Sequence, residues 1–199
     1  MTTIDTESSD RSWQHRERHI LNELRGGERR SLGQLVDRYG EDLMSYLLAI
    51  VGRRELAEDV FQDTWVKVME RIDRFNLRGE FAPWLFRVAR NRAYDCLRHR
   101  RWWRLRVFRP DDDGTPMHDP PAPGDFSERL LTRDMAEALL KDLEPVHREL
   151  VWLRFFREMS YQEIAEHCRI PMGTVKSRLA RALDRVARRY QEIEGEAHG

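Results

Sequence analysis

Lysine, cysteine and long apolar runs are all scarce in this chain of 199 residues. Its two cysteines, Cys96 and Cys168, stand far apart, and neither has a CxxC neighbour or a histidine at metal-ligand spacing. This pattern argues against a disulfide framework or a metal site and favours reduced thiols. No stretch approaches the roughly 18 apolar residues of a membrane helix, and the N-terminus lacks the apolar run of a signal peptide. We therefore expect a cytoplasmic protein that carries no metal or other cofactor.

An excess of charge of either sign is also missing, because 35 basic residues balance 35 acidic ones. Only three of the basic residues are lysines, a bias that genome composition explains most simply. The charges are nevertheless distributed unevenly along the chain. Residues 87–109 contain nine arginines and a single acid, Asp95, whereas acids gather near the N-terminus and at residues 111–113. A chain polarised in this way can present a basic face to nucleic acid despite its zero net charge.

The spacing of apolar residues by three and four predicts an all-α fold with no strands. Polar residues 1–10 are expected to be disordered, and residues 73–83 to form a loop. Helices are expected at residues 32–51, 54–72, 83–104, 127–140, 145–156, 161–168 and 172–189. Five prolines and two glycines between residues 110 and 124 indicate a flexible linker between two helical domains. The predicted divisions are a tail and leading helix at 1–26, a first domain at 27–103, the linker at 104–125, a second domain at 126–190 and a tail at 191–199.

The second domain carries a pattern typical of a helix-turn-helix. Ser160 and Glu163 form an S-x-x-E capping box, which starts a helix at Tyr161. Residues 168–171 form a turn, and a second helix follows from Met172. Arg169 occupies the turn position that often needs a positive φ, where a non-glycine residue costs about 1 kcal/mol. The second helix has an apolar stripe on one side and a different face formed by Lys176, Ser177, Ala180 and Arg181. This second face could enter a DNA major groove.

Two features of the first domain suggest further contacts. Trp84, Trp102 and Trp103 lie among the arginines, and aromatic rings beside basic residues suit unpaired bases. Core packing explains Trp84 at least as well. Upstream, Asp59, Gln62 and Asp63 would share one helix face. We call this face the acidic ridge; it would repel DNA and attract a basic protein partner, although an ordinary solvated face has the same composition.

The ordered combination of these segments resembles the extracytoplasmic-function (group IV) sigma factors of the sigma-70 family. The resemblance rests on AEDVFQDTWVKVM, then FAPWLFRVARNRAYDCLRHRRW, a proline-rich linker and MSYQEIAEHCRIPMGTVKSRLARAL, and it covers about residues 31–190. It implies a sigma-2-like helical bundle and a sigma-4-like helix-turn-helix domain, joined by the flexible linker. It also implies that core RNA polymerase and promoter DNA are the partners. Many relatives are held inactive by an anti-sigma factor, so such an inhibitor is a further partner that the resemblance leaves open.

The resemblance also implies roles for individual residues. Core polymerase would bind Asp59, Val60, Gln62, Asp63 and Trp65. The melted −10 element would contact Asn76, Arg78, Trp84, Arg87, Arg90, Asn91, Arg92 and Tyr94, with the loop at 76–81 capturing a flipped base. The −35 element would be read by Lys176, Ser177, Ala180 and Arg181, with Tyr161, Thr174 and Arg178 on the phosphates. The loop departs from the FRGES pattern common in the family, because residues 75–80 are FNLRGE.

The favoured function is therefore that of a transcription initiation factor that directs core polymerase to promoters. A free-standing helix-turn-helix regulator is the alternative, but such a protein needs neither the acidic ridge nor the helix rich in tryptophan and arginine. An enzyme is disfavoured because the chain has no glycine-rich phosphate loop, no nucleophile motif and no metal-ligand spacing. We expect the helix-turn-helix to bind DNA weakly without polymerase.

Overall fold

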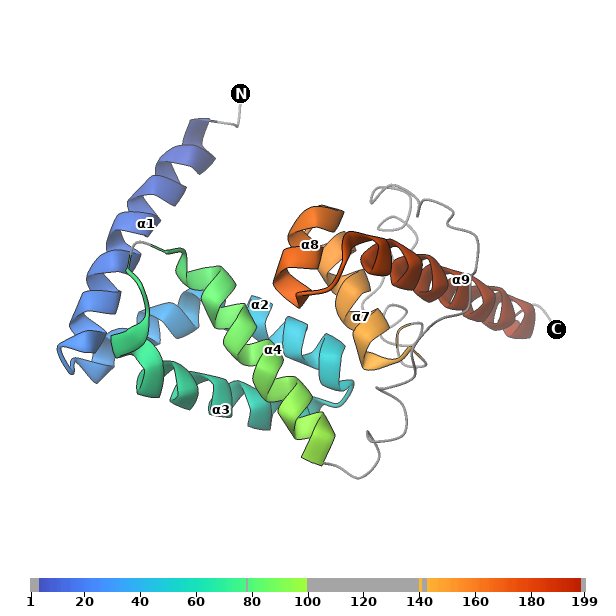
Figure 1. Cartoon of the computed structure of the whole chain (residues 1–199), viewed down its shortest axis with the longest axis horizontal. Coiled ribbons are helices and arrows are strands. Elements are labelled where there is room, and N and C mark those ends of the chain that lie inside the picture. The colour runs from blue at the N-terminus through green and yellow to red at the C-terminus, as the bar shows by residue number, and fades with distance from the viewer. Residues whose placement is uncertain (1–3, 78, 100–139, 141–142, 198–199) are drawn as a thin grey trace.

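The computed structural model describes residues 4–77, 79–99, 140 and 143–197, with the backbone alone for residues 4–12 and 193–197. This part of the chain consists of helices and their connections, with no strand, and the all-α prediction is confirmed. Figure 1 shows the helices in two groups, which we call the first and second modules. The first contains α1 (Ile4–Arg25), η1 (Arg29–Ser31), α2 (Leu32–Val51), α3 (Arg54–Arg71), η2 (Ile72–Arg74) and α4 (Phe81–His99). The second contains α7 (Pro145–Val151), η3 (Trp152–Phe156), α8 (Tyr161–Cys168) and α9 (Met172–Ala197).

Helices α2, α3 and α4 form the body of the first module. Their predicted apolar faces meet in a common core, which includes Leu35, Leu43, Leu47, Val60, Val68, Leu85 and Ala89. Helix α2 runs through Gly40 without a break and ends at Gly52, which has a φ of 71°. Glycine adopts this left-handed conformation at little cost, so the predicted end of the helix is explained by its residue type.

Helix α1 corrects the prediction that residues 1–10 are disordered, because the helix begins at Ile4. Further along, α1 buries Ile20, Leu21 and Leu24 against the rest of the module. Tertiary packing of this apolar end therefore holds a helix whose first ten residues look too polar to fold.

The second module contains the predicted helix-turn-helix. Glu163 N donates to Ser160 Oγ at 3.2 Å, and Ser160 N donates to Glu163 Oε2 at 2.7 Å, so the capping box is confirmed. Arg169 has a φ of 56°, the strained conformation considered for this turn. The apolar stripe of α9 is buried, with Val175, Leu179, Ala182, Leu183 and Val186 in the core. Helix α9 extends past residue 189, the predicted end, to Ala197.

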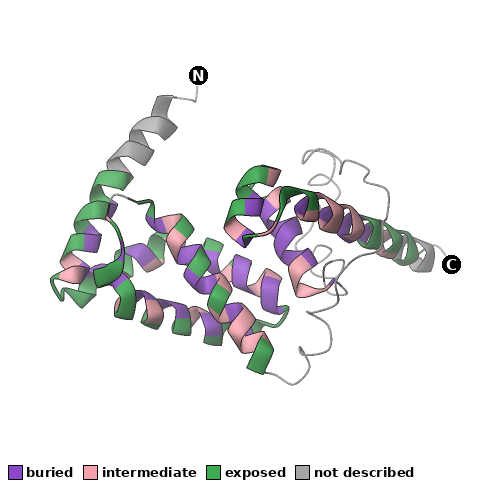
Figure 2. Cartoon of the chain, viewed as in Figure 1, coloured by how far each residue is buried: buried purple, intermediate pink, exposed green. Residues whose placement is uncertain are grey.

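The two modules pack against each other, with α7 lying beside α2 (Figure 1). Figure 2 shows buried residues where these helices meet. The aromatic rings of Tyr46 and Trp152, from α2 and η3, have centroids 4.9 Å apart, and Phe86 of α4 stacks on Trp152 at 6.2 Å. Several features predicted from the sequence lie outside the described residues. They are the linker at residues 104–125, most of the helix at 127–140, Trp102 and Trp103. A close contact between the modules was not predicted from the sequence.

Candidate nucleic-acid and polymerase interfaces

An open pocket of about 400 Å³ lies where the loop after η2 meets the start of α4. Its wall includes rings from both elements, since Phe75 and Trp84 have centroids 5.0 Å apart. Trp84 is only partly buried, and it also packs on Phe81 at 5.7 Å. The pocket is lined by Arg74, Phe75, Asn76, Gly79, Glu80, Pro83, Trp84 and Arg87. This combination of an aromatic wall with arginine and amide groups suits a nucleobase and its phosphate.

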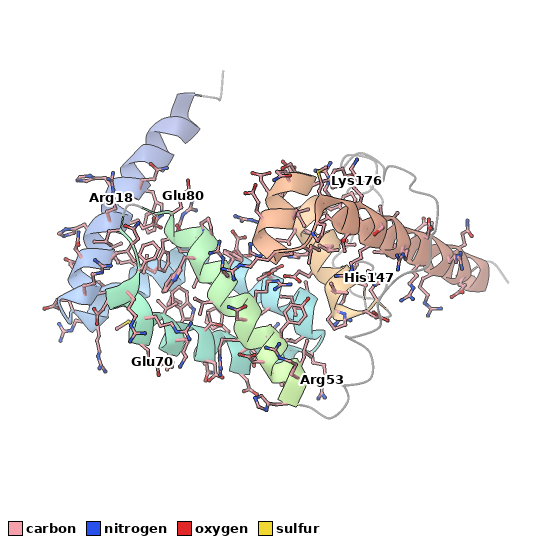
Figure 3. The ribbon with its side chains drawn as sticks, viewed as in Figure 1. Arg18, Arg53, Glu70, Glu80, His147 and Lys176 are labelled. Carbon is pink, nitrogen blue, oxygen red and sulfur yellow. The ribbon has the colours of Figure 1, made fainter. Side chains whose placement is uncertain are left out.

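Arg25 of α1 holds the loop that forms one wall of this pocket. Its Nε donates to the carbonyl oxygen of Ile72 at 3.1 Å, and its Nη2 donates to the carbonyl oxygen of Phe75. Figure 3 shows Glu80, which lines the pocket, just before the start of α4. Sequence reasoning missed Arg25, because nothing in the local pattern of α1 indicates a contact 50 residues away.

The residues of α4 predicted to hold single-stranded DNA do not share one environment. Arg87 and Asn91 are exposed, and Arg87 lines the pocket. Arg92 Nη2 forms an ion pair with Asp63 Oδ2 on α3 at 2.6 Å. Arg90 and Tyr94 instead contact the second module. Arg78 lies outside the described residues.

Glu149 of α7 lies at the centre of the contact between the modules. Its Oε1 accepts a hydrogen bond from Tyr46 Oη at 2.7 Å, and Arg90 Nε donates to the same oxygen at 2.6 Å. Its Oε2 accepts from Tyr94 Oη at 2.6 Å and from Arg90 Nη2 at 3.3 Å. The Glu149 side chain is fully buried, with an exposed fraction of 0%. A buried carboxylate needs this number of donors to offset the loss of its hydration.

The pKa values of these partners reflect their burial beside a carboxylate. Burial raises the pKa of Tyr46 and of Tyr94 well above the usual value, and the charge of Glu149 raises both further. Burial opposes the charge of Arg90, but the attraction of Glu149 outweighs this and raises the pKa of the guanidinium. Both tyrosines therefore remain neutral donors and Arg90 remains a cation around neutral pH.

The acidic ridge on α3 is exposed as predicted, with Asp59, Gln62 and Asp63 open to solvent. Val66 lies one turn further along the helix and is 58% exposed, unusually high for a large apolar residue. Val60 and Trp65, in contrast, are buried in the core of the module. Their side chains fix α3 in position within the module, and the contact of these two residues with core polymerase stays a prediction.

The predicted DNA-reading face of α9 is partly exposed. Figure 3 shows Lys176 near the start of the helix. Its Nζ lies 5.4 Å from the ring centroid of Tyr161 on α8, and Arg154 lies 4.8 Å from the same ring. Ser177 Oγ donates to the carbonyl oxygen of Thr174 at 3.2 Å. The predicted −35 residues Tyr161, Thr174, Lys176, Ser177, Arg178, Ala180 and Arg181 are all half-buried. The turn thus brings predicted contacts from both helices together.

Comparisons with known proteins agree with this division into two modules. Residues 35–103 match the model of Sigma-70 region 2, and residues 133–186 match that of Sigma-70, region 4. The chain is 31% identical to the RNA polymerase sigma factor CarQ of Myxococcus xanthus, over 87% of this chain and 97% of the relative. The chain belongs to the sigma-70 family. The ECF RNA polymerase sigma factor SigL of Mycobacterium tuberculosis is 32% identical over 80% of this chain and 88% of the relative, and this similarity identifies the chain as an extracytoplasmic-function sigma factor. The ECF RNA polymerase sigma factor SigW of Bacillus subtilis is 26% identical over 87% of this chain and 96% of the relative.

Solved structures support the same fold. The sigma factor RpoE of Bartonella quintana, solved with the anti-sigma factor NepR, is 25% identical and has a TM-score of 0.60 over 80% of this chain and 96% of its own. CnrH, solved with the cytosolic domain of CnrY, is 24% identical with a TM-score of 0.58 over 88% of this chain and 97% of its own. This sigma factor is therefore a transcription initiation factor that binds core RNA polymerase and directs it to promoters. Among the described helices, none is long and apolar enough to cross a membrane.

Proposed function

We propose that the pocket beside Trp84 captures a base flipped out of the −10 element. Its aromatic wall provides a stacking surface, and stacking contributes about 1–3 kcal/mol per base. Asn76 and the backbone of the loop face the base edge, while Arg87 holds the neighbouring phosphate. Five further residues are proposed to hold the non-template strand: Arg78, Asn91, Arg92, Arg90 and Tyr94. The last two can do so only when they are released from Glu149.

The second module is proposed to read the −35 element as duplex DNA. Lys176, Ser177 and Arg181 carry donors toward base edges, and Ala180 lets the helix approach the groove closely. Tyr161, Thr174 and Arg178 contact phosphates and fix the register. The capped start of α8 and the tight turn support this role because they set the angle at which α9 leaves the turn.

Core polymerase is proposed to bind the acidic ridge, through Asp59, Gln62 and Asp63, with the exposed Val66 at its end. We propose residues 27–103 as the polymerase- and −10-binding domain, with α1 packed onto it, and 126–190 as the −35-binding domain. The segment 104–125 is the proposed tether. The protein is proposed to act in the cytoplasm, to have no catalytic activity and no cofactor, and to be regulated by an anti-sigma factor, as the inhibitor complex of the Bartonella relative suggests.

Run-off transcription with purified core polymerase and fragmented genomic DNA tests this assignment. We expect discrete initiation that depends on the added protein, because it alone supplies promoter recognition. Trp84→Ala should abolish strand opening while leaving core binding intact, and Phe108→Ala, in the proposed tether, serves as the matched aromatic control. Tight binding to duplex DNA alone, without any initiation, would instead identify a free-standing helix-turn-helix regulator.

A further inference from the structure

The acids and bases of α1 lie on different faces of the helix. Glu17 is buried and accepts a hydrogen bond from Tyr39 Oη. Glu23 accepts a hydrogen bond from Ser31 Oγ at 2.6 Å, and His19 Nε2 lies 3.1 Å from its other carboxylate oxygen. Between residues 13 and 25, where the side chains are described, the exposed ionisable groups are all basic: His15, Arg16, Arg18 and His19. The outer face of α1 therefore attracts anions, because the two acids of this stretch are held against α2 and η1.

Trp13 anchors this stretch of α1 to the rest of the first module. Its Nε1 donates to Tyr39 Oη at 3.2 Å, and the two rings meet edge to face with centroids 6.3 Å apart. The guanidinium of Arg38 lies 5.7 Å from the centroid of the Trp13 ring. The Tyr39 hydroxyl thus holds both Trp13 and Glu17, which are one helical turn apart. The basic outer face is therefore carried on a helix with a fixed position.

A row of aromatic rings joins this anchor to the base pocket. Tyr39 packs on Phe81 of α4, with ring centroids 5.7 Å apart. Phe81 in turn packs on Phe75 at 5.8 Å and on Trp84 at 5.7 Å. Both of these rings line the pocket. Only Tyr39 and Phe81 therefore separate Trp13 from the pocket wall, and α1 and the pocket belong to one packed unit.

The position of Arg25 shows which side of α1 borders the pocket loop, because its guanidinium binds the carbonyl oxygens of Ile72 and Phe75. Arg18, labelled in Figure 3, precedes Arg25 by seven residues. It therefore lies two turns away on the same side, at about 10 Å along the axis. Exposed polar residues spaced by four form a strip on this side, which we call the α1 donor strip. It consists of Gln14, Arg18 and Asn22.

The α1 donor strip has groups that suit a nucleic-acid backbone. Arginine, glutamine and asparagine side chains all donate hydrogen bonds to phosphate oxygens, and these contacts carry no sequence information. Arg18 Nε donates to the carbonyl oxygen of Gln14 at 3.4 Å, which directs the guanidinium along the strip. The Arg18 side chain is nevertheless exposed, so an incoming phosphate can reach it.

We propose that the α1 donor strip binds the phosphate backbone of single-stranded DNA next to the base held in the pocket. The inference rests on the proposed function, because a flipped base leaves its neighbours unpaired and places them at the pocket loop. Arg25 ties that loop to the side of α1 that carries the strip. A strand that leaves the pocket over the loop therefore meets three donors and, between residues 13 and 25, no exposed acid. Helix α1 thus extends the strand-binding site beyond α4.

Opposite charge changes on the strip test the proposal in the full-length chain. The probe is a labelled single-stranded oligonucleotide of mixed sequence, since backbone contacts require no particular sequence. Arg18→Ala should weaken binding about twofold to fivefold, the effect of one exposed ion pair, and Gln14→Lys should strengthen it by a similar factor. A gain of affinity does not arise from a damaged fold, so the two variants together separate a DNA contact from a structural role.

The salt dependence of binding counts the phosphates that the strip holds. Each phosphate bound on single-stranded DNA steepens the plot of log K against log salt by about 0.7. We expect Arg18→Ala to reduce the slope by this amount and Gln14→Lys to increase it. Arg16→Ala is the matched control, because Arg16 is an exposed arginine of the same helix, two residues away and hence on the opposite side. Equal losses in Arg16→Ala and Arg18→Ala would overturn the proposal, since they indicate a general effect of charge.

The double variant of Trp84→Ala and Arg18→Ala tests whether the pocket and the strip hold one strand. If one oligonucleotide contacts both at the same time, the two losses of affinity should multiply, because each contact contributes to the same complex. If the pocket and the strip were alternative sites, loss of either one would leave the other to bind the probe. A double variant that binds much more tightly than the product of the two losses would therefore refute a continuous strand path.

The same measurements distinguish this inference from the proposed function. If Trp84→Ala weakens probe binding while Arg18→Ala and Gln14→Lys behave like the wild type, the strip is excluded and the base pocket stands. If the two strip variants change affinity and slope as expected while Trp84→Ala has no effect, the backbone contact of α1 is supported and the pocket alone is contradicted. Neither result depends on run-off transcription, because the probe binds the chain without polymerase.

Discussion

Arg92 of α4 and Asp63 of α3 form an ion pair, with Nη2 and Oδ2 2.6 Å apart. The pair joins two surfaces that have different proposed partners, because Asp63 belongs to the acidic ridge and Arg92 to the strand-holding face. Both side chains are more than a third exposed, so the pair contributes little to stability. A charge change at Asp63 would therefore alter the environment of both surfaces.

Asp59 therefore offers a cleaner test of the acidic ridge than Asp63. Asp59→Arg should weaken binding to core polymerase and leave single-stranded DNA binding unchanged, because Asp59 is exposed and, unlike Asp63, forms no ion pair with the described residues of α4. A reversal at a charged rim acts mainly on the association rate. Titration of labelled core polymerase at low and moderate salt measures the effect, with Glu41→Arg on α2 as the control. Unchanged core binding would remove the ridge from the polymerase interface.

Arg25 is expected to position the base pocket from outside the predicted domain. Arg25→Ala removes both donors to the carbonyls of Ile72 and Phe75, so the loop should lose its fixed position. Hydrogen bonds from a charged group are worth about 1.5–3 kcal/mol, and we expect a loss of stability of this order. Permanganate reactivity of promoter thymines should fall more than core binding does. Arg29→Ala, at an exposed site nearby, is the control, and equal loss of both activities would mean that Arg25 acts only on folding.

Local patterns in the sequence were sufficient to predict most of the described helices. The capping box at Ser160 and Glu163 is a short-range signal, and it predicted the start of α8 correctly. Gly52 likewise ended α2 through its own backbone preference. Such features depend on residues within one turn of each other.

The missed features all depend on contacts between distant segments. Glu149 lies in a stretch that shows only helical periodicity, and its partners Tyr46 and Tyr94 are 103 and 55 residues away. The prediction of a flexible linker also gave no reason to expect docked modules. Val60 and Trp65 lie in the same turns as exposed ridge residues, so a motif that groups them cannot separate the core side of α3 from its solvent side.

Arg181 provides a test of base readout by α9. Arg181→Ala should reduce discrimination between the correct −35 element and a variant by about 1–3 kcal/mol if the guanidinium makes a bidentate contact with guanine. Promoter competition with the holoenzyme measures this discrimination. Arg185→Ala, on an exposed flank of the helix, should weaken binding to all DNA sequences equally and should reduce the salt dependence of binding. The same uniform loss for Arg181→Ala would assign Arg181 to a phosphate.

Acidification is expected to undock the modules through His167. Burial lowers the pKa of His167, and the nearby charges of Arg90 and Arg87 lower it further, while Glu149 opposes them. The ring also lies against Tyr46 Oη, which remains neutral. Exposed histidine has a pKa of about 6.5, so below that pH the undocked form binds more protons than the docked form. The stability of docking should therefore fall as the pH drops from about 7 toward the lowered pKa.

X-ray scattering between pH 7.5 and 5.5 measures this undocking as a rise in the radius of gyration. His167→Gln removes the titrating ring and keeps a polar side chain near Tyr46, so the variant should keep the same dimensions across this range. Expansion of the His167→Gln chain at the same pH as the wild type would exclude His167 as the responsible group.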